Sequence, residues 1–297
     1  MRKLDVADRW RLDADELSGL GLRRHGPASE PELLVVGDSG FRVLTSGLTE
    51  HDPRGRSPKL DDQVDRFTTG RSSQWEGVTA DGSGRVFILQ EHPGHVFVLS
   101  LDFGRLDEAL QLDVPGRHAE WERSWHEDKN ARGEALLLMR GGHVLVFKQR
   151  DPVALIEFGP KHDASIDLRG DPFLPADETF AVSDQPLHPV RSWELDAPLE
   201  SISDVSRVGG QIFILSAKSR CIAALGPLGD DAKPVGLVGE PLALPDDIAQ
   251  PEGLVVLDEE STPMVAADLP AGDGRDNLFR LTGLVATAHE GVPPCDA

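Results

Sequence analysis

This sequence has few cysteines and no long apolar run, and from its first residues we expect no secretory leader. It has two cysteines in 297 residues, so at most one disulfide can form and no disulfide scaffold is expected. No window approaches eighteen apolar residues, so we expect no membrane-spanning helix. The first residues, Met1 to Asp5, carry charges and no apolar segment of a signal peptide. These absences predict a cytoplasmic protein.

Positive charge is also scarce. Thirty Lys and Arg stand against 51 Asp and Glu, which gives a formal net charge of −21. A surface this acidic repels phosphate backbones and anionic lipids, so we expect neither nucleic acid nor a membrane as a partner. It attracts cations. We expect a small-molecule substrate or ligand as the partner, and we expect the protein to be a monomer.

Several common catalytic signatures are missing as well. The ten His and two Cys show no His-x-x-x-His or Cys-x-x-Cys spacing for zinc. No Gly-x-Ser-x-Gly elbow and no Walker loop occurs. Zinc hydrolysis, α/β-hydrolase chemistry and P-loop nucleotide binding therefore have no support in this sequence.

What the chain does contain is a short motif that recurs along its length. Trp75-Glu76-Gly77-Val78 has a close copy in Pro251-Glu252-Gly253-Leu254, a second in Gly133-Glu134-Ala135-Leu136, and variants with serine. The aligned positions are 58, 58, 69 and 49 residues apart: Ser18, Glu76, Glu134, Ser203 and Glu252. Repeats at such spacing are typical of propellers and solenoids.

A strongly β-prone run follows each motif. These runs, rich in Val, Ile, Leu and Phe, lie at 32–36, 85–89, 143–147, 211–215 and 263–267. The residues that terminate them lie 14 to 20 residues after the motif, and 15 residues after it in the neighbouring units of Glu76 and Glu134. Short strands separated by Gly, Pro and Asp indicate an all-β meander. An irregular β-sandwich would not explain the equal offsets in neighbouring units.

The repeat therefore predicts a β-propeller of four-stranded antiparallel blades that forms a single domain over 1–297. Five blades fit the motif count, and a sixth would have room between residues 163 and 191. Trp193-Glu194-Leu195-Asp196-Ala197 resembles Trp10-Arg11-Leu12-Asp13-Ala14, so the N-terminal strand, about 9–14, is expected to complete the last blade. The tail, about 286–297, is expected to be loose. A short helix is predicted near 121–130.

The first strand of each propeller blade lines the central channel, so the five motif positions should form a ring. Three converging carboxylates repel one another unless protons, water or a cation compensate their charge. Oxygen-only ligands suit a hard cation, and a roomy ring suits Ca²⁺ better than Mg²⁺. The predicted metal ligands are Ser18, Glu76, Glu134, Ser203 and Glu252. The alternative is that these carboxylates only accept backbone hydrogen bonds.

The second strand of a blade returns to the end at which the first begins, so its last residues should surround the same mouth. Such a mouth is the default site for a ligand. The predicted catalytic residues are Asp38, Glu91, Asp268 and Lys148. The predicted ligand-binding residues are Arg71, Lys129, Asn130, Arg132 and Lys218.

Several of these stretches carry a family resemblance. Trp75-Glu76-Gly77-Val78, Asn130-Ala131-Arg132-Gly133-Glu134 and Pro251-Glu252-Gly253-Leu254 resemble the SdiA-regulated-like propellers, a family without a common established activity. The order Ser, Glu, Glu, Ser, Glu around the ring also resembles the calcium-activated nucleotidases (apyrases), which are five-bladed propellers. That resemblance implies a central Ca²⁺ that binds phosphates.

Two functions follow. The first is a calcium-dependent enzyme that acts on a small anionic or oxygen-rich substrate, as a phosphate-ester hydrolase, a lactonase or a lyase or cyclase. The second is a non-catalytic binding propeller in which calcium is structural.

Overall fold

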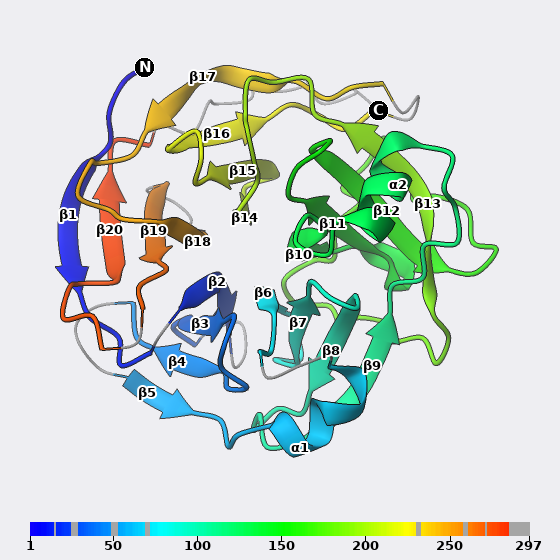
Figure 1. Cartoon of the computed structure of the whole chain (residues 1–297), viewed down its shortest axis with the longest axis horizontal. Coiled ribbons are helices and arrows are strands. Elements are labelled where there is room, and N and C mark those ends of the chain that lie inside the picture. Colours follow the sequence, from blue (N-terminus) through cyan, green and yellow to red (C-terminus); the bar gives the residue numbers. More distant parts are fainter. Residues whose placement is uncertain are drawn as a thin grey trace, which may run out of the picture.

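The computed structural model of the chain describes residues 1–14, 16–24, 29–48, 53–68, 72–229, 233–257, 261–270 and 272–284. In this part of the chain, twenty strands form five four-stranded sheets around a central axis (Figure 1). Each consecutive pair of strands within a sheet is antiparallel. The prediction of a five-bladed propeller is confirmed, and residues 163–191 form no sixth blade.

Every blade has the same order of strands from the axis outwards. The innermost strands are β2 (Leu17–Arg23), β6 (Trp75–Ala80), β10 (Gly133–Leu138), β14 (Asp204–Val208) and β18 (Pro251–Leu257). The second strands are β3 (Glu32–Gly37), β7 (Val86–Gln90), β11 (Val144–Lys148), β15 (Gln211–Ser216) and β19 (Thr262–Ala267). The third strands are β4 (Leu44–Ser46), β8 (His95–Leu99), β12 (Ala154–Pro160), β16 (Cys221–Leu225) and β20 (Leu278–Thr282). The outer strands are β5 (Pro53–Arg56), β9 (Leu106–Gln111), β13 (Leu187–Glu194), β17 (Leu237–Ala243) and β1 (Asp5–Trp10). Blades 1 to 5 are numbered from the one that begins with β2.

The second strands are continuously apolar because both of their faces are buried between blades. Side chains alternate across a strand, so neighbouring residues face opposite blades. In β11, Val144 and Val146 belong to the apolar cluster between blades 2 and 3. Leu145 and Phe147 belong to the cluster between blades 3 and 4. Five such clusters, one at each junction between blades, make up the core of the described chain.

The ring closes through the N-terminal strand, as predicted, but the strand lies earlier than 9–14. β1 pairs with β20 and ends at Trp10, just as β13 ends one residue after Trp193. The chain beyond β1 is held by Asn277, whose side chain accepts the N–H of Leu12 at 2.7 Å and donates to its carbonyl at 3.1 Å. The tryptophans therefore mark the ends of the outer strands, because the large ring fills the junction next to the following blade.

Helices are few and short in the described residues. They are α1 (Asp61–Val64), α2 (Glu120–Glu127) and the 3-10 turns Asp65–Phe67 and Arg140–Gly142. α2 confirms the short helix predicted near 121–130. None of the described helices is long and apolar enough to cross a membrane. The tail at 286–297 lies outside the described residues.

The longest connection, residues 161–186 between β12 and β13, crosses the end of the channel at which the innermost strands finish. We call it the strap. It is held to blade 3, where the N–H of Leu174 donates to Leu138 O at 3.0 Å. It is also held to blade 2, where the N–H of Phe180 donates to Asp81 Oδ2 at 3.0 Å. The strap thus accounts for most of the segment, residues 163–191, that was long enough for a sixth blade.

Candidate functional site

The mouth of the channel, where the innermost strands begin and the second strands end, is built from one repeated backbone feature. In four blades the register shifts around the predicted ring position, leaving that residue without a paired partner. These unpaired positions are Ser18, Glu76, Glu134 and Glu252. A bulge re-aims a side chain away from the regular alternation of a strand. The ring residues are therefore distinguished by local geometry as well as by sequence.

Three of these bulges follow a strained residue. Glu16, Gln74 and Gln250 have φ values of 51°, 50° and 40°, a left-handed conformation that residues other than glycine rarely adopt. The carbonyl of Gln74 accepts the N–H of Glu91 at 2.9 Å, and that of Gln250 accepts the N–H of Asp268 at 2.9 Å. Each bond fixes the end of a second strand beside the start of its first strand.

Blade 3 makes the same link without the strain, from the N–H of Gln149 to Arg132 O at 2.8 Å. The predicted adjacency of ring and mouth positions is therefore observed in the backbone. The innermost strands of blades 1 and 2 also pack closely at the mouth: a Cβ on Gly19 would lie 2.0 Å from the carbonyl oxygen of Glu76. Only glycine fits there.

The carboxyl groups at the mouth perturb one another. Burial, followed by the charges of Glu91, Asp38 and Glu252, raises the pKa of Glu76 well above its usual value. Burial and the charges of Glu76, Glu91 and Glu252 likewise raise the pKa of Glu134. A set of acids that repel each other in a poorly solvated place holds protons more tightly or attracts a cation.

Two members of the set titrate near neutrality. Burial raises the pKa of Glu91 to about 7, although hydrogen bonding from the Arg132 N–H and the charge of Arg150 oppose the shift. Burial raises the pKa of Glu252 to about 7, against a hydrogen bond with Ser203. The pKa of Asp268 is also raised by burial.

Positive charge does not compensate this set. Within the described residues, no Lys or Arg forms an ion pair with Glu76, Glu134 or Glu252. The charge of Arg150, which sequence reasoning missed, opposes the rise in the pKa of both Glu91 and Glu134. Arg150 itself pairs with Asp128 at 3.3 Å. Arg150 lies two residues after the end of the second strand β11, and this position is the signal that could have identified it.

The predicted basic residues occupy other places. The guanidinium of Arg132 is turned away into hydrogen bonds with Trp125 O and Pro93 O, both 2.7 Å. The ammonium of Lys148 is capped by the carbonyls of the loop that follows its strand, including Pro152 O at 3.3 Å. Neither cation is presented to the channel, because each satisfies nearby backbone oxygens.

The remaining predicted residues are spread around the rim. Lys129, Asn130 and Lys218 are exposed. Asp38 accepts a hydrogen bond from Ser72 Oγ at 2.7 Å, and Asp268 lies 3.4 Å from Gln250 Nε2. Arg71 lies outside the described residues.

Sequence reasoning also overlooked Asp204, which occupies the position taken by Gly or Ala in the other motifs. It is 2% exposed, and its Oδ2 accepts the N–H groups of Leu254 at 2.7 Å and Leu20 at 3.1 Å. This carboxylate joins the innermost strands of blades 4, 5 and 1. An acidic residue at a motif position that otherwise holds Gly or Ala is the signal that could have identified Asp204.

Below the mouth the channel contains a cavity of about 220 Å³. Residues of all five innermost strands line it, and Phe173 to Ala176 of the strap lie at its far end. Its walls are mainly Leu and Val. The acidic mouth therefore lies above an apolar interior.

Comparisons with known proteins agree with this architecture. Glutaminyl cyclase from Myxococcus xanthus is similar in structure, with a TM-score of 0.55 and 13% identity over 95% of this chain and 96% of that one. The PQQ-bound aldose sugar dehydrogenase from Streptomyces coelicolor gives a TM-score of 0.54 and 10% identity over 94% and 97%. At these identities the likeness concerns the fold alone.

Among curated proteins none matches the chain. The SdiA-regulated family model, by contrast, matches residues 73–267, from the start of blade 2 to the second strand of blade 5. This confirms the family resemblance carried by the Glu-Gly motifs. The chain belongs to the SdiA-regulated family.

Proposed function

We propose that the mouth binds a divalent cation, calcium in preference to magnesium, and uses it to hold a small anionic or oxygen-rich molecule. The observation that carries this proposal is the group of buried and partly buried acids at the mouth whose pKa values are raised, although none of them forms an ion pair with a Lys or Arg among the described residues. A bound cation would offset their repulsion. Calcium accepts several oxygen ligands in a flexible arrangement, which suits a wide ring better than the strict octahedron of magnesium.

The donor set fits a hard cation by its chemistry. Glu76, Glu134 and Glu252 supply carboxylate oxygens, and Ser18 and Ser203 supply hydroxyl oxygens. Among the described residues, however, no three His, Cys, Asp or Glu side chains already form a group that could hold a metal. Binding therefore requires the Glu side chains to rotate toward a common point.

A carboxyl group with a pKa near 7 can both donate and accept a proton at neutral pH. Glu91 meets this condition, and its backbone is fixed beside the ring by the bond to Gln74. We assign it the role of general acid and base. A bound cation would supply a Lewis acid that polarises an oxygen of the substrate. The reaction classes are phosphate-ester hydrolysis, lactone hydrolysis and elimination or cyclisation.

Calcium titration by calorimetry tests the cation site. Glu76→Gln and Glu134→Gln keep side-chain size but remove one negative charge each, so each is expected to weaken calcium binding at least tenfold. Glu240→Gln, an exposed position on β17, is the matched control and should bind like the unchanged protein. Equal affinity in all four proteins would remove the mouth from consideration.

Turnover is tested separately, on a panel of phosphate esters and lactones with calcium present. Glu91→Gln should abolish proton transfer while calcium binding falls far less than in Glu76→Gln. Calcium binding that stabilises the fold, without turnover of any member of the panel, would instead favour a structural role.

A further inference from the structure

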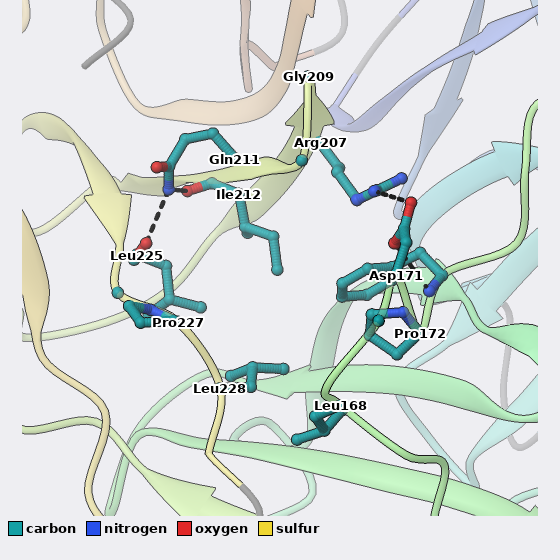
Figure 2. A pocket seen from close by; sticks show the side chains of 14 residues that line it. Leu168, Asp171, Pro172, Arg207, Gly209, Gln211, Ile212, Leu225, Pro227 and Leu228 are labelled. Carbon is teal, nitrogen blue, oxygen red and sulfur yellow. Dashed lines mark hydrogen bonds and ion pairs between the residues drawn. The ribbon is translucent and has the colours of Figure 1, made fainter. Parts of the chain in front are cut away.

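A second site lies on the face opposite the mouth, between the strap and blade 4. It is a cavity of about 480 Å³, larger than the one in the channel and within the range of small-molecule sites. Figure 2 shows residues of the strap on one side and residues of the β14–β15 hairpin on the other. The acidic groups of the mouth take no part in it.

Apolar side chains form one part of the walls of this cavity, beside backbone and the polar side chains of Asp171, Arg207 and Gln211. Leu168 and Pro172 come from the strap, Ile212 from β15, and Pro227 and Leu228 from the segment after β16. Leu168 and Leu228 are only partly buried, so apolar surface remains available to a ligand. An apolar chain or ring that fills the cavity would remove this surface from water.

One ion pair borders the apolar walls. Arg207 Nη2 lies 2.6 Å from Asp171 Oδ2, and the guanidinium stacks on Phe173 with 4.6 Å to the ring centroid. Arg207 Nε is buried and has no hydrogen-bond partner in the described chain. Of the three nitrogens of this guanidinium, only Nη2 is bonded within the described residues. Nε is covered by the protein, whereas Nη1 is neither buried nor bonded within the described residues, so Nη1 is the donor available to a ligand beside the apolar part of the cavity.

The charge of the ligand follows from this pair. Asp171 already neutralises Arg207 and would repel a carboxylate, whereas Arg207 would repel an ammonium. An uncharged carbonyl avoids both penalties and can accept a hydrogen bond from the guanidinium. An amide is best suited, because its N–H can also donate to Asp171. The polar edge of the cavity thus selects a neutral head group.

We propose that this cavity binds an uncharged amphipathic molecule with an amide or ester carbonyl and an apolar body of medium length. The ligand places its carbonyl toward Arg207 and its apolar part against Leu168, Ile212 and Leu228. The site is independent of the cation proposed at the mouth, because the two share no residue. Binding would also hold the strap against blade 4.

Calorimetry with a matched series of eight-carbon probes tests the proposal. Octanamide, octanoate and octylammonium share one chain and differ in head group. Octanamide is expected to bind at least fivefold more tightly than either charged probe. Equal binding of all three, tighter binding of octanoate, or no binding of octanamide at millimolar concentration would overturn the proposal.

Two variants localise the binding. The double change Arg207→Met with Asp171→Asn removes the ion pair without leaving one charge alone, and should weaken octanamide about tenfold. Its control is Arg105→Met with Asp107→Asn, an exposed pair on blade 2 at 2.7 Å. Leu228→Trp fills the cavity and should abolish binding, whereas Leu101→Trp, at an exposed position, should not.

Thermal melting shows whether each variant is folded. The mouth variant Glu76→Gln should bind octanamide normally, so failure of the calcium proposal and failure of this one are distinguishable. Octanamide binding that is unchanged in both the double variant and Leu228→Trp would place the probe elsewhere and sink the assignment.

Discussion

The carboxylate of Asp204 accepts the backbone N–H of Leu254 at 2.7 Å, so that a side chain of blade 4 completes the hydrogen bonding of blade 5. The same oxygen accepts the N–H of Leu20 in blade 1 at 3.1 Å. The edges of innermost strands have no neighbouring strand on the channel side, and their buried N–H groups need other partners. A single acid therefore joins three blades around the axis.

Replacing Asp204 by Ala should destabilise the protein by about 2–4 kcal/mol, because it leaves the N–H groups of Leu254 and Leu20 buried without acceptors. The free energy of unfolding in urea measures the loss. Ser206→Ala, which removes a single bond to the N–H of Val256, should cost about 1 kcal/mol. A loss in Asp204→Ala no larger than in Ser206→Ala would contradict the role in joining three blades.

The architecture could be predicted because it is encoded locally and repeated. A second strand such as β11 lies between two blades, so its run of Val, Leu and Phe is apolar on both faces and easily recognised. The residues around the mouth could be predicted from the spacing between Glu76 and Glu91. Two short strands and a turn bring the chain back to the end of the channel at which the first strand begins. The limits of β1 could not be predicted, because its partner β20 lies at the other end of the chain.

The site was predicted less well, because side-chain directions depend on distant neighbours. Arg132 and Lys148 have the right positions in the sequence, but backbone carbonyls nearby attract both cations away from the channel. No periodic pattern of the sequence predicts the bulges at the ring positions or the path of the strap across the channel. The path of the strap depends on contacts with other blades, which a pattern within one blade does not contain.

Stability should depend on pH in the absence of divalent cations. The folded state raises the pKa of Glu91 from 4.5 to about 7, so it binds this proton more tightly than the unfolded chain does. Stability is therefore greatest near pH 4.5–5, falls as pH rises to about 7, and then levels off. Glu91 alone accounts for about 3 kcal/mol of this loss. Chemical unfolding at pH 5, 6, 7 and 8 with a chelator measures the trend.

Calcium should restore the stability that is lost as the pH rises to 7, because protons and the cation compete for the same oxygens and the protons have then dissociated. Its affinity should accordingly rise between pH 5.5 and 8. The melting temperature with and without calcium at each pH provides the check. A calcium-induced shift of the same size at pH 5.5 and pH 8 would show that these carboxyl groups do not take part.

Glu134→Gln should stabilise the chelator-treated protein at pH 8. The amide removes one charge from a group in which burial, Glu76 and Glu91 already oppose ionisation, so the gain should be about 1–2 kcal/mol. The gain should shrink as the pH is lowered toward 5, because the raised pKa of Glu134 favours its neutral form in the unchanged protein. Glu240→Gln, on the exposed face of β17, should have no effect at either pH. A destabilised Glu134→Gln at pH 8 would mean that the charged carboxylate is needed for the fold.

The strap should be loosened at Phe180 when Asp81 is replaced by Ala, although the N–H of Gly82 still donates to Glu178 O at 2.8 Å. Asp81 is 5% exposed, and its Oδ2 accepts the N–H of Phe180 at 3.0 Å as well as the guanidinium of Arg85. Burial acts to raise the pKa of this acid, but its hydrogen bonds with Ser83, Arg85 and Phe180 prevail and the pKa is lowered, so the contact persists at neutral pH.

Amide hydrogen exchange over residues 173–180 measures the loosening. In Asp81→Ala, exchange at Phe180 should accelerate by at least tenfold, because one hydrogen bond of the strap is lost and the segment opens locally. Ser83→Ala is the matched control: it removes a contact of the same carboxylate within the β6–β7 turn, at 2.6 Å, but leaves the bond to the strap. Equal acceleration in both variants would assign the effect to the turn. Protection that survives in Asp81→Ala would show that the other bonds of the strap hold it, namely the N–H of Gly82 to Glu178 O at 2.8 Å in blade 2 and the bonds to blade 3.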